Sequence, residues 1–234
     1  MKTVHVIQHT SGEYLGLIED HLEGRGVRFR YTRPFATKGS LPAPDALRDG
    51  LILLGGGPWG GAGSRDLPTL EREIALARVC LERDWPLVGI GLGAQIVAWA
   101  ARGRSEPAAL EFSVTTATRV VDSALEGYLP ARYPIAIYMR DWPVPPAAAQ
   151  VLARDPQARP VLWQVGRRTL GFAGHPGLKV AMVEDLVMEF EESAPEVDSG
   201  LARLRAAQPA IEDALVPIMT GVVRLAGWMD DADR

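Results

Sequence analysis

The chain has 234 residues and a formal net charge of −4, and 47% of its residues are hydrophobic, which suits one large α/β domain with a buried core. The acidic balance argues against a nucleic-acid partner, because no excess of basic residues is available to neutralise phosphates. A single cysteine excludes an internal disulfide and no apolar run could span a membrane, so we expect a cytoplasmic protein without a membrane partner.

Strand and helix patterns alternate through the first half of the chain. Runs of apolar or alternating residues predict strands at 3–9, 27–32, 51–54 and 87–90. Apolar residues at helical spacing predict helices at 15–22, 70–81 and 96–100, and residues 34–44 are predicted as a loop. This succession favours an α/β fold with a doubly wound, mostly parallel sheet flanked by helices, whose ligand site lies above the carboxyl ends of the strands.

The second half of the chain is less regular. The pattern predicts strands at 112–121, 135–138, 161–165 and 170–172, with turns at 141–143 and 174–177. Helices are predicted at 179–190 and 197–228, the second with a candidate kink at Pro217. We therefore expect one domain of residues 1–192 and a C-terminal helical extension of residues 193–234, packed on that domain or on a partner.

The stretch from Pro86 to Gly103 joins a short strand, a tight turn and a helix. This combination describes a nucleophile elbow, which lifts one side chain above the carboxyl edge of an α/β sheet. The residue at the apex is Gly91, which has no side chain to lift. His9 and the glycines at 55–57 also fall at predicted strand ends, so we expect them to converge with Gly91.

Three blocks carry a resemblance to the class I glutamine amidotransferases. In chain order they are Leu54-Gly55-Gly56-Gly57-Pro58, Gly89-Ile90-Gly91-Leu92-Gly93-Ala94-Gln95 and Gly171-Phe172-Ala173-Gly174-His175-Pro176. Over roughly the first 180 residues the chain is similar to stand-alone members that resemble the glutaminase part of GMP synthase. The resemblance implies a flavodoxin-like or Rossmann-like sheet.

The resemblance also implies where a catalytic group would lie. In that family a cysteine at the elbow attacks the side-chain amide of glutamine, a histidine acts as base and a glutamate orients the histidine. The base position is His175, but the nucleophile position is Gly91 and the acid position is Gly177. Because catalytic residues act as a unit, we expect this chain not to hydrolyse glutamine.

Further residues are candidate contacts of a ligand or an oxyanion. The resemblance implies backbone amide donors in the glycine-rich loop and after the elbow apex, and an acidic residue near the glutamine pocket. The candidates are Gly56, Gly57, Leu92, Gln95, His9 and Glu111. For His9 the alternative is a turn-stabilising role, and for Glu111 the alternative is a place on the surface.

Other candidates have ordinary structural alternatives. His175 could be a relic that bonds a backbone carbonyl, and Cys80 is expected to be an inert buried thiol rather than a displaced nucleophile. The four histidines show no metal-ligand spacing, so we expect no metal, and nothing in the sequence calls for a cofactor.

Three functions remain open. We favour a non-catalytic, amidotransferase-like protein that binds a small amide, an amino acid or a synthase or other enzyme subunit, with a homodimer as a further partner. The second is an active amidotransferase or hydrolase that acts on another amide or ester and uses His175 with water or with another residue such as Ser64 or Ser113. The third is a purely structural subunit. An open pocket with free amides would support the first two, and a filled pocket the third.

Overall fold

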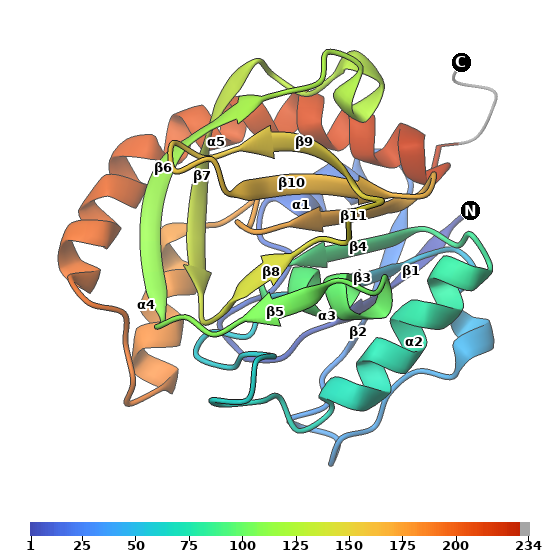
Figure 1. Ribbon diagram of the computed structural model, residues 1–234, viewed down its shortest axis with the longest axis horizontal. Helices are drawn as coiled ribbons and strands as arrows, with labels where there is room; N and C mark the ends of the chain where they lie inside the picture. Colours follow the sequence, from blue (N-terminus) through green and yellow to red (C-terminus); the bar gives the residue numbers. More distant parts are fainter. Residues whose placement is uncertain (230–234) are drawn as a thin grey trace.

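The computed structural model describes residues 1–229, so residues 230–234 of the predicted C-terminal extension lie outside the described residues. Within residues 1–229, nine strands form one sheet in the order β2-β1-β3-β4-β11-β10-β9-β6-β7 (Figure 1). The strands are β1 (Thr3–Ile7), β2 (Arg28–Thr32), β3 (Leu51–Leu53), β4 (Leu87–Ile90), β6 (Glu111–Arg119), β7 (Arg132–Met139), β9 (Gln150–Arg154), β10 (Pro160–Val165) and β11 (Thr169–Phe172).

The sheet has a parallel part and an antiparallel part. Strands β2, β1, β3, β4 and β11 are parallel neighbours, whereas β10, β9, β6 and β7 join by antiparallel pairing. The carboxyl ends of the parallel strands therefore meet at one edge, where β1, β3, β4 and β11 deliver the segments that the sequence motifs mark.

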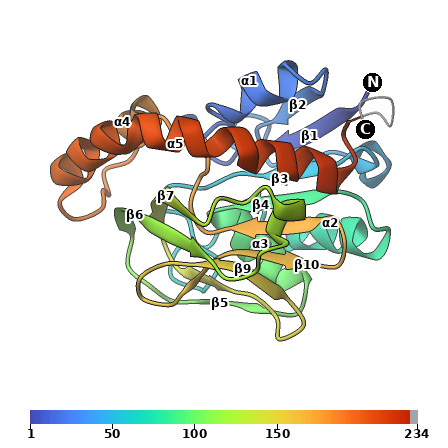
Figure 2. The same ribbon diagram turned by 90° about the horizontal axis from the view of Figure 1, so that it is seen from above.

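Helices cover both faces of the sheet, as Figure 2 shows. Helices α2 (Leu70–Glu82) and α3 (Leu92–Ala100) bury apolar residues against one face. Helix α1 (Ile18–Glu23) and the second half of α5 (Val197–Ala226) pack on the other face, and α4 (Val180–Glu189) packs with the first half of α5 beside β6 and β7. This layering shields the strands from water on both faces.

Several elements differ from the prediction. The predicted turn at 141–143 overlaps β8 (Trp142–Val144), which pairs with the unpredicted β5 (Arg104–Glu106) in a separate two-stranded sheet. A two-stranded sheet has only edges, and Pro143 is tolerated there because edge strands leave backbone groups unpaired. Strand β9 was also missed, and short 3-10 turns η1 (Pro44–Leu47) and η2 (Ala124–Gly127) occupy predicted irregular segments.

Two helices differ at the ends. Helix α1 begins at Ile18 rather than at Leu15, because Gly16 takes a positive φ of 61° that a right-handed helix cannot contain. Helix α5 runs unbroken through Pro217 to Ala226, so the candidate kink does not end it. Just beyond it, the Trp228 indole donates a hydrogen bond to the Asp49 carbonyl at 2.7 Å.

Candidate functional site

The elbow is present in backbone form. Gly91 lies between β4 and α3 with φ 58° and ψ −116°, a combination that is strained for residues with a Cβ. Its amide donates to the Phe172 carbonyl at 2.8 Å, and Gly93 donates to Leu54 at 3.0 Å. A Cβ at Gly91 would contact only the Gly55 Cα, at 3.3 Å. The backbone turn that would hold a nucleophile is therefore present, but Gly91 has no side chain that could act as one.

The glycine-rich loop after β3 is bonded to a residue that the sequence did not single out. The Gly57 amide donates to Glu13 Oε2 at 2.6 Å, and a Cβ on Gly55 would overlap Glu13 Oε1. Glu13 is buried, and burial raises the pKa of its carboxyl to about 7 although the bond from Gly57 opposes the shift. The carboxyl group thus occupies the space beside the amide that the resemblance identified as an oxyanion donor.

His175 is bonded on both ring nitrogens to the backbone. Its Nε2 lies 2.8 Å from the Tyr14 carbonyl, which can only accept, so Nε2 carries the proton. Its Nδ1 accepts a hydrogen bond from the Gly177 amide at 3.1 Å. Burial lowers the pKa of His175 to about 4. The imidazole is neutral near pH 7, but its lone pair is already engaged.

The acid position leaves little room for a side chain. A Cβ on Gly177 would lie 3.0 Å from both the amide nitrogen and Cγ1 of Ile18. The Gly177 carbonyl accepts a hydrogen bond from the Leu17 amide at 3.0 Å. The segment from Glu13 to Ile18, hereafter the closing segment, therefore contacts the glycine-rich loop, His175 and Gly177 together.

His9 joins two elements beneath this site. Its Nδ1 lies 3.0 and 3.1 Å from the carbonyls of Leu54 and Gly55, and its Nε2 lies 2.8 Å from Glu73 Oε2 on α2. Burial alone would lower the pKa of His9, but the Glu73 carboxylate and the Gly55 carbonyl raise it above its ordinary value. The Thr69 hydroxyl donates to the other Glu73 oxygen at 2.5 Å. These contacts hold the end of β1, the glycine-rich loop and α2 in place.

Asp141 holds the outer part of the glycine-rich loop, and Gln95 is bonded to the residue before Asp141. The Gln95 amide nitrogen donates to the Arg140 carbonyl at 2.7 Å, and its oxygen accepts a hydrogen bond from the Ser105 hydroxyl at 2.9 Å. Buried Asp141 accepts hydrogen bonds from the amides of Gly61 and Ala62 at 3.1 and 3.0 Å. Both side chains are hydrogen-bonded to other residues of the chain.

The Glu111 carboxylate is bonded to an arginine and a serine. Arg159 donates to its carboxylate at 3.0 Å and the Ser113 hydroxyl at 2.6 Å. Burial would raise the pKa of Glu111, but these bonds and the Arg159 charge lower it. Its hydrogen bonds among the described residues therefore involve neither the glycine-rich loop nor His175.

The groups around the elbow are enclosed. Gly55, Gly56, Gly57, Gly91, Leu92 and His175 are all buried. The Leu92 side chain lies against Gly56, where an added Cβ would overlap Leu92 Cδ2. Cys80 is buried on α2, and burial raises the pKa of its thiol to about 12. Across residues 1–229, no three His, Cys, Asp or Glu side chains are grouped to hold a metal ion, and no helix is both long and apolar enough to cross a membrane.

Solved structures resemble this chain, although no protein-family model and no curated protein sequence matches it. A glutamine amido transferase from Methylobacillus flagellatus is 21% identical with a TM-score of 0.80, over 96% of this chain and 95% of that one. A glutamine amidotransferase from Thermotoga maritima is 20% identical with a TM-score of 0.79, over 96% and 98% of the two chains. The chain has the glutamine amidotransferase fold. The predicted fold class is thereby confirmed.

A third solved structure of similar shape is described as part of a larger enzyme. This putative GMP synthase subunit from Thermoplasma acidophilum is 18% identical with a TM-score of 0.55, over 89% of this chain and 98% of that one. In the glutamine amidotransferase fold of the present chain, Gly91 of the elbow lies against Gly55 of the glycine-rich loop and is bonded to Phe172 of the third sequence block. The closing segment was not anticipated, because Glu13 lies in an irregular loop without any motif.

Proposed function

We propose that this protein is a glutamine amidotransferase-like protein that does not hydrolyse glutamine and acts by binding another protein. The observation that carries the proposal is the bond between the Glu13 carboxylate and the Gly57 amide. A donor that would stabilise a developing oxyanion is already bonded to an oxygen of the same chain. We include residues 1–192 as the amidotransferase-like domain and residues 193–234 as its C-terminal extension.

The chemistry of amide hydrolysis supports this proposal. A covalent route needs a nucleophile that bonds the amide carbon while a base removes its proton. Gly91 supplies no such group, and the His175 lone pair is bonded to the Gly177 amide. A hydrolase that uses Ser113 with His175 has no support in the contacts, since the Ser113 hydroxyl donates to Glu111. Ser64 is exposed, outside the enclosed site.

The closed site favours a macromolecular partner over a small amide ligand. Glutamine would have to displace Glu13 from Gly57, and the segment that carries Glu13 is also bonded to His175 through the Tyr14 carbonyl. One structure of the same fold is described as belonging to a putative GMP synthase. An enzyme subunit is therefore the partner class that we propose, with a second copy of this chain as the alternative.

The test measures glutamine turnover and glutamine binding separately. Purified protein is incubated with glutamine, and ammonia release is followed by a glutamate dehydrogenase-coupled assay. We expect no release above the blank and no rise in melting temperature with glutamine, because a ligand that binds the folded state would raise it. Turnover of about 1 per second or faster, the range of ordinary enzymes, would refute the proposal. A Glu13→Ala variant tests the closure, since melting that becomes glutamine-dependent only in this variant would assign the exclusion to Glu13.

A further inference from the structure

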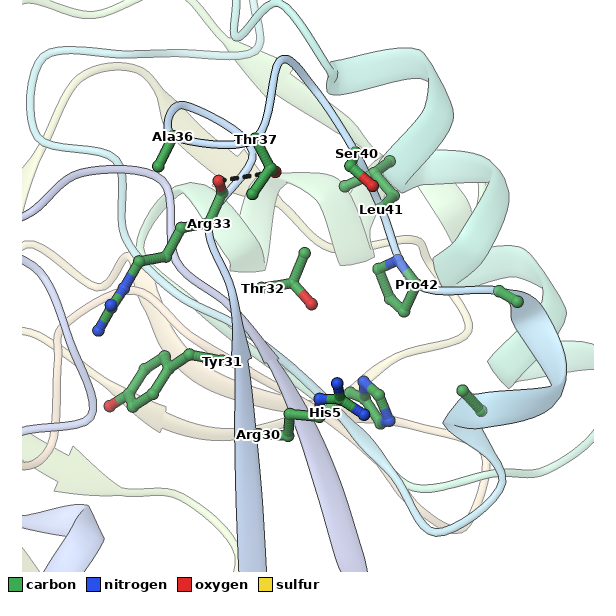
Figure 3. A pocket seen from close by; sticks show the side chains of 12 residues that line it. His5, Arg30, Tyr31, Thr32, Arg33, Ala36, Thr37, Ser40, Leu41 and Pro42 are labelled. Atoms are coloured by element: carbon green, nitrogen blue, oxygen red, sulfur yellow. Dashed lines mark hydrogen bonds between the residues drawn. The ribbon is translucent and has the colours of Figure 1, made fainter.

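A second feature is a surface hollow of about 590 Å³ at the edge of the sheet, outside the closed site. It lies between the strands β1 and β2 and the segment 36–46 (Figure 3). His5 and Arg30 are register partners on the two parallel strands, and their side chains lie next to each other in the hollow. The volume is within the usual range for binding sites of small organic molecules.

The charge around this hollow is positive, in a chain whose net charge is −4. The lining includes Arg30, Arg33 and His5 and no acidic residue. Burial and Arg30 lower the pKa of His5, and Arg33 donates to Gln8 Oε1 at 2.8 Å and points away from Thr32 (Figure 3), so Arg30 is the cation that faces the hollow. The nearby acids Asp45 and Asp49 face Arg83 and Lys2, at 3.3 and 3.4 Å. Among the described residues, no carboxylate lies within ion-pair distance of Arg30. Its guanidinium is therefore available to an anion from solution.

Polar and apolar groups divide the remainder of the lining. Thr32 projects from β2 between the Arg30 end and the loop, and Ser40 adds a second hydroxyl (Figure 3). Leu41 and Pro42 form an apolar wall next to them. The arrangement offers a cationic end, hydroxyl donors and a surface for the carbon skeleton of a ligand.

We propose that this hollow binds a small organic phosphate. The phosphate lies against Arg30, because a guanidinium matches phosphate oxygens with paired N–H donors. The hydroxyl of Thr32 donates to the same group, and the organic part packs on Leu41 and Pro42 with the Ser40 hydroxyl beside it. The site is independent of the elbow, so a failure of this proposal leaves the proposed function untouched.

The experiment follows the imidazole resonances of His5 by NMR during titration with AMP, inorganic phosphate and adenosine. We expect saturable shifts with AMP at a Kd below about 1 mM and binding of inorganic phosphate at least about tenfold weaker. Adenosine should cause no saturable shift. Equal affinity for AMP and inorganic phosphate would overturn the role of the apolar wall, and binding of adenosine as tight as that of AMP would overturn the phosphate site.

Two matched variants assign the site to a residue. Arg30→Gln should weaken AMP binding by about tenfold or more, since a charged hydrogen bond to phosphate is lost. Arg28→Gln changes the same residue type on the same exposed strand, outside the lining, and should leave the affinity within about twofold. Equal weakening by both variants would show diffuse charge attraction and overturn the proposal, as would unchanged binding in Arg30→Gln. Both side chains are exposed, so both variants are expected to fold.

Discussion

Glu13 and Gly57 lie 44 residues apart in the chain, and the carboxylate of the first accepts a 2.6 Å hydrogen bond from the amide of the second. A carboxylate oxygen has the charge and acceptor geometry of the oxyanion that such an amide would stabilise. The protein therefore supplies its own occupant for a position that a substrate would need. The consequences can be measured in stability as well as in activity.

The first prediction concerns the pH dependence of stability in Glu13→Gln. The pKa of Glu13 is about 7 in the folded protein against an ordinary value of 4.5. Between these values the folded state binds more protons than the unfolded state, so the free energy of unfolding falls as pH rises. From pH 5 to pH 8 we expect the wild-type value to fall by about 2.5 kcal/mol more than that of Glu13→Gln.

Urea denaturation at the two pH values measures this difference. His9 also has a raised pKa, so its contribution is full below 6.5 and is lost as pH rises through the raised value. This contribution acts in the same direction. It is smaller in Glu13→Gln, because the Glu13 charge is one cause of the raised His9 pKa, so the comparison measures Glu13 together with its effect on His9. Exposed Glu23→Gln is the control and should follow the wild type. If the free energy of unfolding depends on pH in the same way in wild type and Glu13→Gln, the raised pKa of Glu13 is contradicted.

The second prediction is that Gly91→Cys restores no glutaminase activity. A thiol at the apex would still meet an imidazole whose lone pair is bonded to Gly177 and a donor already bonded to Glu13. The positive φ at Gly91 also makes the substitution cost about 1–3 kcal/mol, or a few degrees of melting temperature. Ammonia release measures the activity, and calorimetry measures the loss of stability.

Gly91→Ala controls for backbone strain and should lower the melting temperature by a similar amount. Recovery of ordinary enzyme rates in Gly91→Cys would contradict the arrangement around His175.

The third prediction concerns the acid position. Gly177→Glu should destabilise the fold by about 2 kcal/mol or more, because the new Cβ must push against Ile18, including its backbone nitrogen. The double variant Gly91→Cys/Gly177→Glu should also fail to hydrolyse glutamine, since the closing segment remains. Gly24→Ala is the control for an added side chain, because Gly24 is exposed and has an ordinary helical φ of −60°. If the double variant is as stable as the wild type and releases ammonia, the closing segment does not block the site and the prediction is wrong.

The fourth prediction tests the buried pair of His9 and Glu73. In Glu73→Gln the pKa of His9 should fall below its ordinary 6.5, because burial then acts without the opposing carboxylate. Loss of one partner from a buried pair should also cost about 3 kcal/mol at pH 6. NMR titration of the His9 ring and urea denaturation measure the two effects. Exposed Glu71→Gln on the same helix should change neither quantity. A His9 pKa that stays raised in Glu73→Gln would refute the pairing.

Local patterns predicted the elements that are buried as continuous units. The apolar strands that begin at Leu51 and Leu87 are present and lie next to each other in the parallel part of the sheet. The helix that begins at Leu70 is also present, and Cys80 is buried as expected. Strand β9 was missed, since its residues alternate weakly and are held by pairing with β10 and β6. Which distant strand a segment pairs with cannot be predicted from the pattern of a short stretch of sequence.

The candidate site was likewise predicted only in part. The blocks around Gly57, Gly91 and His175 were correctly expected to meet, because strand ends of a parallel sheet converge. For Glu111 the sequence left open a place near them and a place on the surface, and the structure shows its carboxylate bonded to Arg159 and Ser113. Its position depends on the antiparallel strands β6 and β7, for which the pattern gave strands but no partners.

The sequence by itself determined that the elbow presents no nucleophile, because a glycine at position 91 lacks a side chain in any conformation. It also determined the order of the three blocks and, through them, the expected fold. Only the tertiary structure decided what fills the site. The contacts of Glu13 with Gly57 and of Tyr14 with His175 join residues 44 and 161 positions apart, and such contacts exist only once the sheet has brought the strand ends together.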